Sequence, residues 1–455
     1  MPQRKLSDFV EATAREFKIP GVAVGVWADG KEAYACHGVT SVDNPLPIDQ
    51  DTLFLAASVT KTFTATTLMR QVAEGKVELD APVRRYIPEL QLKDRQAADK
   101  VTVLNLLNHT AGLDWRVNAD TGEGDDALER SVAKMAELKQ IAPPGTRVSY
   151  SQAGYNLLGR IIEQVTGQTF EQAVASLVFE PLGLSHSFFA RDDIMTRRFA
   201  VGHNRGEDGL LSIARPWRYS RGDNPGGGIA SSVADLLLWA RFHLGDGSAA
   251  SGVRVLPAHA LHQMKEPTAE LRASSLGDAI GLSWFLRAVG HAGSANGQFA
   301  ELLIVPERTF AVISLSNAGP DGIPFNRAVV RWALEHYLGL LDRDPEPIPF
   351  DAVRAREIVG TYENEMMTFT IDTVGARLRL EVRIKPEIRT ATDKEPPPDP
   401  PPADFGLLPG DKDEYIITDG AFKGQRGFFS RDRSGAVVGV DLAGRLFSRV
   451  PTVCK

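Results

Sequence analysis

The sequence is poor in cysteine, has no long apolar run and has no excess of positive charge. Only two of its 455 residues are cysteine, Cys36 and Cys454, so disulfide bonds do not organise the fold and the pattern fits a reducing compartment. Lys and Arg number 51 against 58 Asp and Glu, and the formal net charge of -7 offers no electrostatic footprint for nucleic acid or an anionic membrane. No segment reaches the ~20 apolar residues of a spanning helix, and the charged N-terminal segment lacks the apolar core of a secretory signal. We therefore expect a cytoplasmic protein without nucleic-acid or membrane partners.

Motifs of several enzyme classes are also absent. The sequence has no H-E-x-x-H, no C-x-x-C and no G-x-x-x-x-G-K-[ST], so zinc hydrolase and phosphate-loop chemistry lack support. It has no G-x-S-x-G nucleophile elbow either, which argues against an α/β-hydrolase. We expect chemistry that uses neither a metal nor an organic cofactor.

The composition that remains is typical of a globular protein with two or three domains, since 43% of the residues are hydrophobic and 24% charged. Apolar runs predict two hairpins, residues 22–27 with 32–37 and residues 300–305 with 310–315. Mostly helical sequence lies between them, and an amphipathic helix is expected over 325–340. A sheet built from both ends of this region, with a helical middle, is an α+β arrangement.

The composition changes after that helix. Residues 342–349 contain three prolines among alternating charges, which predicts a linker between a main domain at 1–341 and a second domain at 350–455. In the second domain, apolar residues at 378, 380, 382 and 384 alternate with charged ones, and shorter strand candidates follow between glycines. We expect a small antiparallel β domain, with the proline-rich residues 395–402 as an extended loop.

Ser58 and Lys61 form an S-x-x-K motif at the start of a helix-competent segment. Residues three apart on a helix share one face, so the lysine amine can reach the serine hydroxyl. A helix N-terminus stabilises an oxyanion, and a buried lysine that loses its proton can activate serine. The alternative is that Ser58 caps the helix and Lys61 is a solvated charge. A second S-x-x-K, at Ser131 and Lys134, has no tyrosine motif at a suitable distance and is interpreted as chance.

Two downstream motifs favour the catalytic interpretation. Tyr150 lies in a loop directly before an apolar helix, where it can share a proton with a serine–lysine pair, and two cationic groups nearby are expected to lower its pKa. His291, Gly293 and Ser294 precede a strong strand, where glycine permits close approach of a substrate backbone and the next N–H can complete an oxyanion hole. Taken singly, the tyrosine could be a core aromatic and the histidine a turn residue.

In identity and order, Ser58-x-x-Lys61, Tyr150 and His291-x-Gly293 resemble the serine β-lactamase and penicillin-binding protein superfamily. The resemblance is to its class C-like branch, which includes family VIII esterases and D-aminopeptidases, and it covers roughly residues 10–340. It implies an antiparallel sheet flanked by helices, a helical lobe across the cleft and an acyl-enzyme on the motif serine. The C-terminal β domain is similar to lipocalin-like extensions of some members.

The resemblance implies a role for each motif residue. Ser58 is expected to be the nucleophile and Lys61 its proton acceptor, while Tyr150 relays the proton to the leaving group and later takes one from water. His291 stands where many relatives carry lysine, and is expected to tune Tyr150 and orient the substrate.

The remaining predicted contacts bind the substrate. The N–H groups of Ser58 and Ser294 are expected to form the oxyanion hole, beside Gly293. The usual Tyr-x-Asn is Tyr-x-Gln here, so Gln152 reaches one methylene further and efficient β-lactam hydrolysis is not expected. A literal Tyr-x-Asn at residues 362–364 lacks the surrounding motif and is interpreted as a decoy.

The substrate is less well defined by the sequence. Acidic residues 114–130 and the basic, aromatic residues 215–221 could border the cleft, with Trp217 and Tyr219 lining an apolar pocket. We expect a serine hydrolase acting on a small ester or amide. A D-amino-acid-specific aminopeptidase or amidase, acyl transfer to an alcohol or amine, and a sensor that acylates without turnover stay open. So does a homo-oligomer, and the C-terminal domain is expected to act in gating or assembly.

Overall fold

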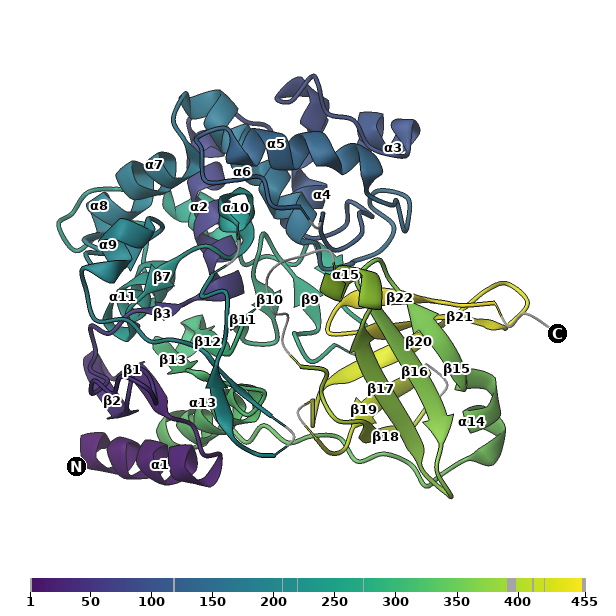
Figure 1. Cartoon of the computed structure of the whole chain (residues 1–455). Helices are drawn as coiled ribbons and strands as arrows, with labels where there is room; N and C mark the ends of the chain where they lie inside the picture. Colours follow the sequence, from purple (N-terminus) through teal and green to yellow (C-terminus); the bar gives the residue numbers. More distant parts are fainter. Residues whose placement is uncertain are drawn as a thin grey trace.

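The structure is a computed structural model that describes residues 2–117, 119–206, 208–218, 220–272, 274–390, 398–410, 413–420 and 422–451. It has a large α+β domain and a C-terminal barrel beside it (Figure 1). None of the helices in these ranges is both long and apolar enough to cross a membrane.

The large domain is built on one antiparallel sheet with the strand order β2-β1-β13-β12-β11-β10-β9-β8. The strands are β1 Gly21–Ala28, β2 Lys31–Gly38, β8 Ala269–Glu270, β9 Ala279–Ile280, β10 Phe285–Leu286, β11 Val289–Ala295, β12 Gln298–Val305 and β13 Phe310–Ser316. Strand β1 pairs with β13, with Val24 opposite Ser314. The two ends of this domain therefore share one sheet, and the two predicted hairpins are confirmed.

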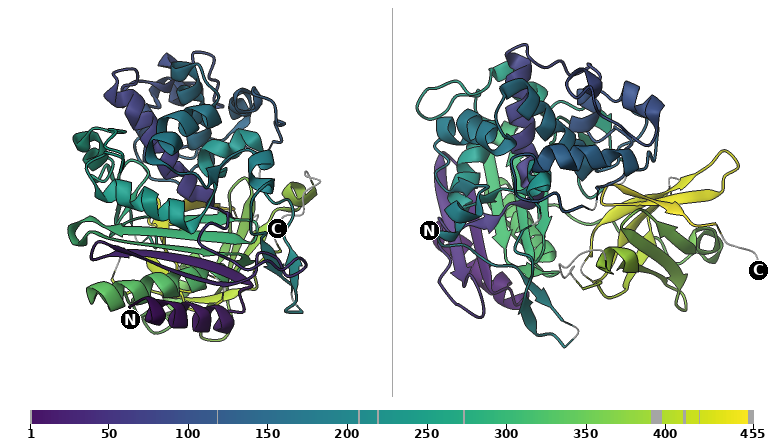
Figure 2. Two further views of the ribbon diagram at one scale, coloured as in Figure 1. Left: turned by 90° about the vertical axis from the view of Figure 1, so that its left-hand side faces the viewer. Right: turned by 45° about the horizontal axis from the view of Figure 1, so that its top comes forward.

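Helices cover both faces of the sheet (Figure 2, left). Helices α1 Pro2–Glu16 and α13 Gly322–Leu338 pack on one face, and α11 Val233–Leu244 packs on the other. The side chains of β1 alternate accordingly: Val22 and Val24 join the core beneath α1 and α13, whereas Ala23 joins the core of the helical lobe. Burial on both faces explains the continuous apolar runs of these strands.

The helical lobe lies above the sheet and is centred on two helices, α2 Thr60–Ala73 and α6 Gln152–Thr166. Helix α2 is buried almost all round. Helix α6 begins where Ser151 Oγ accepts from the backbone N–H of Gly154, and it ends at Gly167 in the left-handed conformation. The shorter α-helices are α3 Arg95–Lys100, α4 Val103–Leu107, α5 Ala127–Ala133, α7 Phe170–Val174, α8 Glu180–Leu182, α9 Arg191–Met195, α10 Asn224–Gly227 and α12 Ala258–Gln263.

Short elements complete this domain. The 3-10 turns are η1 Ala57–Val59, η2 Val83–Arg85, η3 Lys134–Glu137, η5 Arg221–Asp223 and η6 Pro306–Arg308, and η4 Ala175–Phe179 is a π-helical turn. Two three-stranded sheets are formed by β3 Phe54–Leu55, β7 Ala230–Ser231 and β4 Ser187–Phe188, and by β14 Ala318–Gly319, β5 His203–Arg205 and β6 Leu211–Ile213. The first of them delivers the chain from Leu55 into η1.

The C-terminal domain is a closed eight-stranded antiparallel barrel in which each strand pairs with the next and β15 pairs with β22. Its strands are β15 Gly360–Glu363, β16 Met367–Thr373, β17 Leu378–Ile384, β18 Ala403–Leu407, β19 Glu414–Ile417, β20 Arg426–Arg431, β21 Val437–Leu442 and β22 Arg445–Arg449, with helices α14 Ala352–Ile358 and α15 Pro386–Thr390. Buried Tyr362, Phe369, Tyr415 and Phe429 fill its centre. The predicted antiparallel, lipocalin-like architecture is confirmed.

The predicted linker at 342–349 contains no helix or strand but is held at both ends. Arg331 pairs with Asp342 at 2.9 Å and with Asp344 at 2.7 Å, which fixes the linker to α13. The backbone N–H of Ile348 donates to the carbonyl of Leu407 in the barrel at 2.8 Å. In the predicted proline-rich loop, residues 398–402 have no helix or strand, and 395–397 lie outside the described residues.

Candidate active site

Ser58 lies in the turn η1, which leads directly into α2. Its neighbours Ala57 and Val59 are buried, whereas Ser58 itself is partly exposed. Ala57 has φ +46°, a conformation that costs a non-glycine residue free energy and that clusters at functional sites. The chain therefore presents the Ser58 side chain from a strained turn at the N-terminal end of a buried helix.

Lys61, on the first turn of α2, is fully buried and reaches Ser58. Its Nζ lies 3.2 Å from Ser58 Oγ, 2.8 Å from Gln152 Oε1 and 2.6 Å from the carbonyl oxygen of Gly226. Burial lowers the pKa of Lys61 well below its usual range, and the positive charges of Arg445 and Arg116 lower it further, while Asp223 raises it. A neutral amine has two hydrogens for the two carbonyl oxygens, which leaves its lone pair facing the serine hydroxyl.

Tyr150 contacts both Ser58 and Lys61. Its hydroxyl is hydrogen-bonded to Ser58, and its ring lies 4.9 Å from Lys61 Nζ and 4.4 Å from the ring of His109. Burial raises the pKa of Tyr150 to about 12, against the lowering effects of the Ser58 hydrogen bond and of Arg445. The expectation of a lowered pKa is therefore wrong, because desolvation of the phenolate outweighs the nearby positive charge. At neutral pH Tyr150 carries its proton.

Gln152, at the first position of α6, is directed at Lys61 rather than into open space. Its Oε1 accepts from Lys61, and its Nε2 donates to Asn156 Oδ1 at 3.2 Å and to the carbonyl of Asp223 at 3.1 Å. A Cβ at Gly226 would lie 1.9 Å from Gln152 Nε2, so any side chain there would displace the Gln152 amide. The predicted substrate contact of this amide competes with its hold on the lysine.

His291, on β11, lies beside Tyr150, with 6.3 Å between ring centroids. Burial and the proximity of Lys61 lower the pKa of His291 to about 3, so the imidazole is neutral at pH 7. Its Nδ1 lies 2.7 Å from the carbonyl oxygen of Ala292 and therefore donates there. Its Nε2 has no hydrogen-bond partner among the described residues. His291 thus offers an acceptor, not the positive charge of a lysine at this position.

Gly293 and Ser294 pass next to the turn that carries Ser58. A Cβ at Gly293 would lie 2.2 Å from the carbonyl oxygen of Ala56 and 3.2 Å from the Cβ of Ala57, so no side chain fits there. The side chain of Ser294 is exposed, and residues 293–294 pair with β12 on one side only within the described chain. This arrangement places the backbone of β11 beside η1, as two N–H groups of an oxyanion hole require.

The two predicted pocket residues differ in outcome. Trp217 is half-buried, donates from Nε1 to the carbonyl of Ala200 at 2.9 Å, and packs on a cluster that includes Ala57 and Ala295. It therefore borders the segments that carry Ser58 and Ser294. Tyr219 lies outside the described residues.

Sequence reasoning missed the contribution of the barrel. The backbone N–H of Tyr150 donates to the carbonyl of Gly444, in the turn between β21 and β22, at 2.7 Å. The next residue, Arg445, places its guanidinium carbon 5.1 Å from the centroid of the Tyr150 ring and 4.5 Å from that of Trp115. No local motif marks Arg445, because only the docking of two distant domains brings it to the site.

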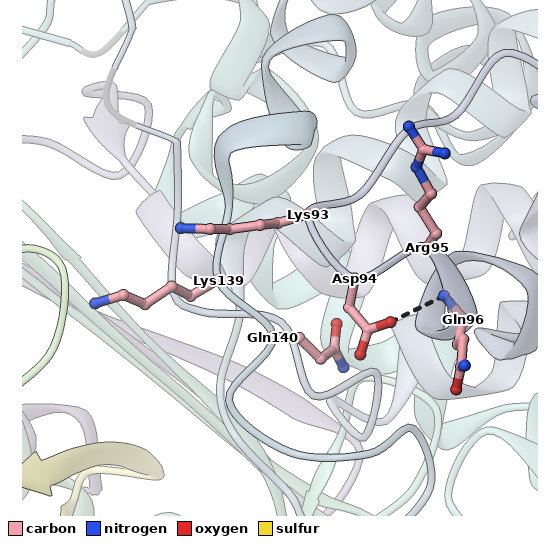
Figure 3. Close-up of a pocket in the computed structure, with 6 residues that line it drawn as sticks. All are labelled: Lys93, Asp94, Arg95, Gln96, Lys139 and Gln140. Carbon is pink, nitrogen blue, oxygen red and sulfur yellow. Dashed lines mark hydrogen bonds between the residues drawn. The ribbon is translucent and has the colours of Figure 1, made fainter.

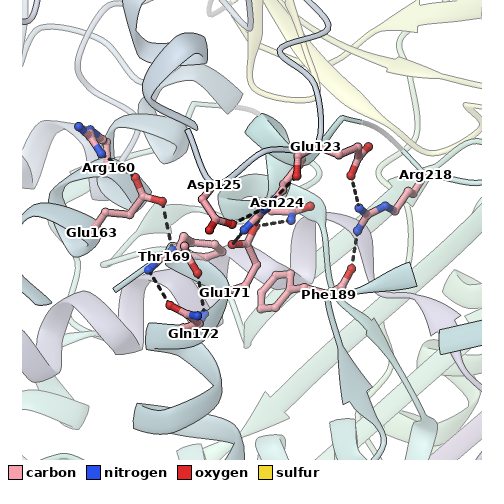
Figure 4. Close-up of polar contacts among 12 residues, drawn as sticks. Glu123, Asp125, Arg160, Glu163, Thr169, Glu171, Gln172, Phe189, Arg218 and Asn224 are labelled. Carbon is pink, nitrogen blue, oxygen red and sulfur yellow. Dashed lines mark hydrogen bonds and ion pairs between the residues drawn. The ribbon is translucent and has the colours of Figure 1, made fainter. Parts of the chain in front are cut away.

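A network of polar contacts supports the segment that holds Lys61 (Figure 4). Glu171 Oε1 accepts from Asn224 Nδ2 at 2.7 Å, and Asn224 is the first residue of α10, which carries the Gly226 carbonyl. Glu123 pairs with the buried Arg218 at 2.9 Å in the same network. These contacts fix one of the acceptors of the lysine amine.

Other sequence candidates lie outside the site. In the second S-x-x-K, Ser131 Oγ accepts from Asn156 Nδ2 at 3.4 Å, and exposed Lys134 pairs with Glu137 at 3.7 Å. In the second Tyr-x-Asn, the Tyr362 hydroxyl donates to the carbonyl of Ile358 inside the barrel domain. A surface hollow of the helical lobe contains none of the predicted site residues (Figure 3); it is lined by Lys93, Asp94, Arg95, Gln96, Lys139 and Gln140. Across the described ranges, no three His, Cys, Asp or Glu residues gather in a way that could hold a metal.

Comparisons with known proteins agree with this architecture. Residues 6–336 match the Beta-lactamase family. "Penicillin-binding protein 4" of Amycolatopsis lactamdurans is 34% identical over 372 residues, which cover 78% of this chain and 96% of the relative. The structure of SurE superposes with a TM-score of 0.74 at 25% identity over 98% of this chain and 99% of SurE, and SurE with D-Leu superposes at 0.73.

The octameric penicillin-binding protein homologue from Pyrococcus abyssi shares the fold, with a TM-score of 0.65, 23% identity and coverage of 98% of this chain and 100% of that one. The match over residues 6–336 includes every predicted motif residue. The chain therefore belongs to the beta-lactamase family.

Proposed function

We propose that this protein is a serine hydrolase that cleaves a small ester or amide through an acyl intermediate on Ser58, without a cofactor. One observation carries the proposal: the Ser58 hydroxyl lies within reach of both the Lys61 amine, at 3.2 Å, and the Tyr150 hydroxyl. A serine is a weak nucleophile until a base accepts its proton, and both a base and an acid adjoin it here.

The protonation states assign the roles in acylation. Neutral Lys61 accepts the proton of Ser58 as its Oγ bonds to the substrate carbonyl carbon, and the carbonyl electrons move to the oxygen, which the N–H groups of residues 58 and 294 stabilise. Tyr150, protonated because its pKa is raised, donates to the leaving group as the scissile bond breaks. The proton on Lys61 then replaces the one Tyr150 has lost.

Deacylation repeats the sequence with water as nucleophile. A water molecule loses a proton to Lys61, which is neutral again, and its oxygen bonds to the acyl carbon. The bond from the acyl carbon to Ser58 Oγ then breaks, and Ser58 takes the proton from Lys61. An amine or alcohol in place of water gives acyl transfer from the same intermediate.

Turnover of p-nitrophenyl butyrate, with intact-mass detection of the butyryl adduct, tests the proposal. Ser58→Ala should abolish both the adduct and turnover. The matched control is Ser131→Ala, which removes the hydroxyl of the other S-x-x-K and should leave both unchanged. An adduct that persists in Ser58→Ala would sink the proposal.

A second candidate is an amidase or acyltransferase for D-amino acid derivatives. It is supported by the similarity to SurE, of which one structure contains D-Leu, over 98% of this chain. Release of p-nitroaniline from D-alanyl but not L-alanyl p-nitroanilide would favour the amidase. Formation of N-butyryl-D-leucine when D-leucine is added to the p-nitrophenyl butyrate assay would favour acyl transfer.

The sensor and the β-lactamase are distinguished by turnover. A single burst equal to the enzyme concentration would favour a sensor that acylates without release. We expect slow nitrocefin hydrolysis, because the Gln152 amide holds Lys61 and Asn156. The predicted cytoplasmic location and a homo-oligomer are further proposals, and light scattering on the purified protein tests the oligomer against a monomer mass of 49.5 kDa.

A further inference from the structure

Three polar side chains form a continuous chain of hydrogen bonds that ends at Lys61. Asp223 is the last residue of η5, and Gln152 and Asn156 lie one turn apart on α6. Asn156 Nδ2 donates to Asp223 Oδ1 at 3.1 Å, and Gln152 Nε2 donates to Asn156 Oδ1 at 3.2 Å. Gln152 Oε1 then accepts from Lys61 Nζ at 2.8 Å. Asp223, Asn156 and Gln152 are called the amide chain below.

The carboxylate of Asp223 gives the amide chain a direction. An ionised carboxylate only accepts hydrogen bonds, whereas an amide side chain has one accepting end and one donating end. Asn156 therefore turns its NH₂ group to Asp223, which leaves its oxygen for Gln152. Gln152 in turn presents its own oxygen to the lysine. The carbonyl oxygen of Asp223 favours the same orientation, because it also accepts from Gln152 Nε2 at 3.1 Å.

The second carboxylate oxygen of Asp223 accepts from Arg116 Nη2 at 2.6 Å. Both side chains are largely buried, with 10% of the Asp223 side chain and 15% of the Arg116 side chain exposed. Asp223 raises the pKa of Lys61 and Arg116 lowers it, so the two charges oppose one another at the lysine. The ion pair therefore holds a carboxylate at the head of the amide chain without adding a net charge beside the site.

We propose that Asp223 is a positioning residue that fixes, through the amide chain, which end of the Gln152 amide faces Lys61. The inference rests on the proposed hydrolase function, in which the lysine amine takes the proton of Ser58. An amine whose two hydrogens are bound by the Gln152 oxygen and the Gly226 carbonyl directs its lone pair to the serine. A reversed Gln152 amide would present a donor to the amine, whose lone pair would then turn away from Ser58 to accept it.

Asp223→Asn tests the direction of the amide chain. The new side chain has one oxygen for two donors, Arg116 and Asn156. The charged guanidinium takes that oxygen, because hydrogen bonds to charged groups are the stronger ones, and the NH₂ group then faces Asn156 and reverses the chain. We expect kcat for p-nitrophenyl butyrate to fall by about tenfold or more, since this is roughly the factor that one hydrogen bond to a charged group contributes.

The double variant Asp223→Asn with Asn156→Asp exchanges the carboxylate and the amide. Position 223 then gives its oxygen to Arg116 and its NH₂ group to the carboxylate at position 156. That carboxylate also accepts from Gln152 Nε2, so the Gln152 oxygen again faces the lysine. The double variant should therefore recover most of the kcat that Asp223→Asn loses.

The pH dependence of kcat/KM gives a readout that a structural role alone would not move. Loss of the carboxylate in Asp223→Asn should lower the pKa of Lys61 and move the rising limb to lower pH. The double variant brings the carboxylate closer to the lysine and should move the limb to higher pH. Asn156→Leu breaks the amide chain without a change of charge, so kcat should fall while the limb moves little.

Other groups near Lys61 do not account for that limb. Besides Asp223 and Arg116, the titratable and charged groups that face the lysine are His109, His291, Tyr150, Tyr155 and Arg445. Burial lowers the pKa of both histidines, that of His291 to about 3, and raises the pKa of both tyrosines, that of Tyr150 to about 12. An arginine keeps its charge throughout.

The orientation of the Gln152 amide can also be measured without a substrate. In protein labelled with ¹⁵N-glutamine, nuclear Overhauser effects between the Gln152 NH₂ protons and the Lys61 Hε protons should be weak in the wild type. They should strengthen in Asp223→Asn and weaken again in the double variant. The matched control is Asp126→Asn, which removes an exposed carboxylate that pairs with Arg130 and should change none of these quantities. Thermal unfolding verifies that each variant is folded.

Two results would overturn the inference. One is a double variant no more active than Asp223→Asn, which would show that the direction of the amide chain does not matter. The other is a kcat for Asp223→Asn within about threefold of wild type, with an unchanged Gln152 amide, which would show that the Asp223 carbonyl alone orients it. Neither result touches the hydrolase proposal, which the butyryl adduct on Ser58 tests in the wild type. If that adduct does not form, the Overhauser effects still decide the orientation of Gln152.

Discussion

Replacing Gly293 by alanine should push β11 away from η1, the turn that carries Ser58. The added Cβ would lie 2.2 Å from the carbonyl oxygen of Ala56, a backbone atom that cannot rotate away. Real Cβ atoms essentially never come closer than 3.0 Å to another heavy atom, so the strand and the turn must separate by about 1 Å. Gly293 has no left-handed φ, and the effect is therefore steric alone.

A separation of that size would disrupt the proposed oxyanion hole, because its two N–H groups come from η1 and β11. A displacement of about 1 Å costs roughly a hundredfold in rate when groups must be aligned, and loss of one oxyanion donor costs about a hundred- to a thousandfold in kcat. We expect kcat for p-nitrophenyl butyrate to fall by about a hundredfold or more. Overpacking should also lower the free energy of unfolding by about 1–3 kcal/mol.

The control is Gly290→Ala on the same strand, where the nearest atom, the carbonyl oxygen of Leu302, would lie at 3.0 Å. A shift of a few tenths of an ångström accommodates it, away from η1. Rates of adduct formation by intact mass separate acylation from product release. If Gly293→Ala keeps kcat within about threefold of wild type while Gly290→Ala behaves identically, the assignment of β11 to the oxyanion hole is wrong.

Three further predictions concern protons and their partners. Gln152→Met removes the amide oxygen that accepts from Lys61 and should lower kcat by about tenfold with little change in KM. Gln152→Glu should hold the lysine amine protonated, and should therefore shift the rising limb of the plot of kcat/KM against pH to higher pH. An unshifted limb would contradict this. In the wild type, kcat/KM should rise with pH through one ionisation whose pKa is well below that of an exposed lysine, because Lys61 acts when neutral. It should not fall again until Tyr150 deprotonates near its pKa of about 12. A falling limb between about pH 8 and 10 would refute the role of Tyr150 as the protonated acid. Burial raises the pKa of Asp441 from 3.8 to about 6, so the folded state binds this proton more tightly than the unfolded state and the free energy of unfolding declines as pH rises through that window. The free energy of unfolding of Asp441→Asn, relative to that of the wild type, should therefore increase by up to about 3 kcal/mol between pH 4 and 7. A difference in thermal unfolding that does not depend on pH would count against this.

The sequence predicts those parts of the fold and site that are encoded locally. The hairpins of the main sheet follow from apolar runs that end in turn residues. The contact between Ser58 and Lys61 follows from helical periodicity, because residues three apart share one face of a helix. Strands β15, β16 and β18 were not predicted; β15 and β18 are short, and β15 pairs with β22 only when the barrel closes.

Electrostatic properties are less accessible to sequence reasoning. The sign of the pKa shift of Tyr150 depends on how completely its hydroxyl is desolvated, and the sequence shows only that cations are nearby. The role expected for the C-terminal domain, gating or assembly, was inferred from its lack of a motif. The contact between Gly444 and Tyr150 shows that a domain without a motif of its own can still contribute to a site.

The docking of the β21–β22 turn on Tyr150 also sets an order of events during translation. Asp441, at the start of that contact, is 294 residues beyond Arg147, its partner in the main domain. At synthesis rates of 5–20 residues per second, a nascent chain carries Ser58, Lys61 and Tyr150 for about 15 to 60 seconds before the ribosome has made the turn that meets them. Throughout that interval the growing polypeptide has its nucleophile but lacks the arginine from the barrel. The complete active site can therefore form only late in translation.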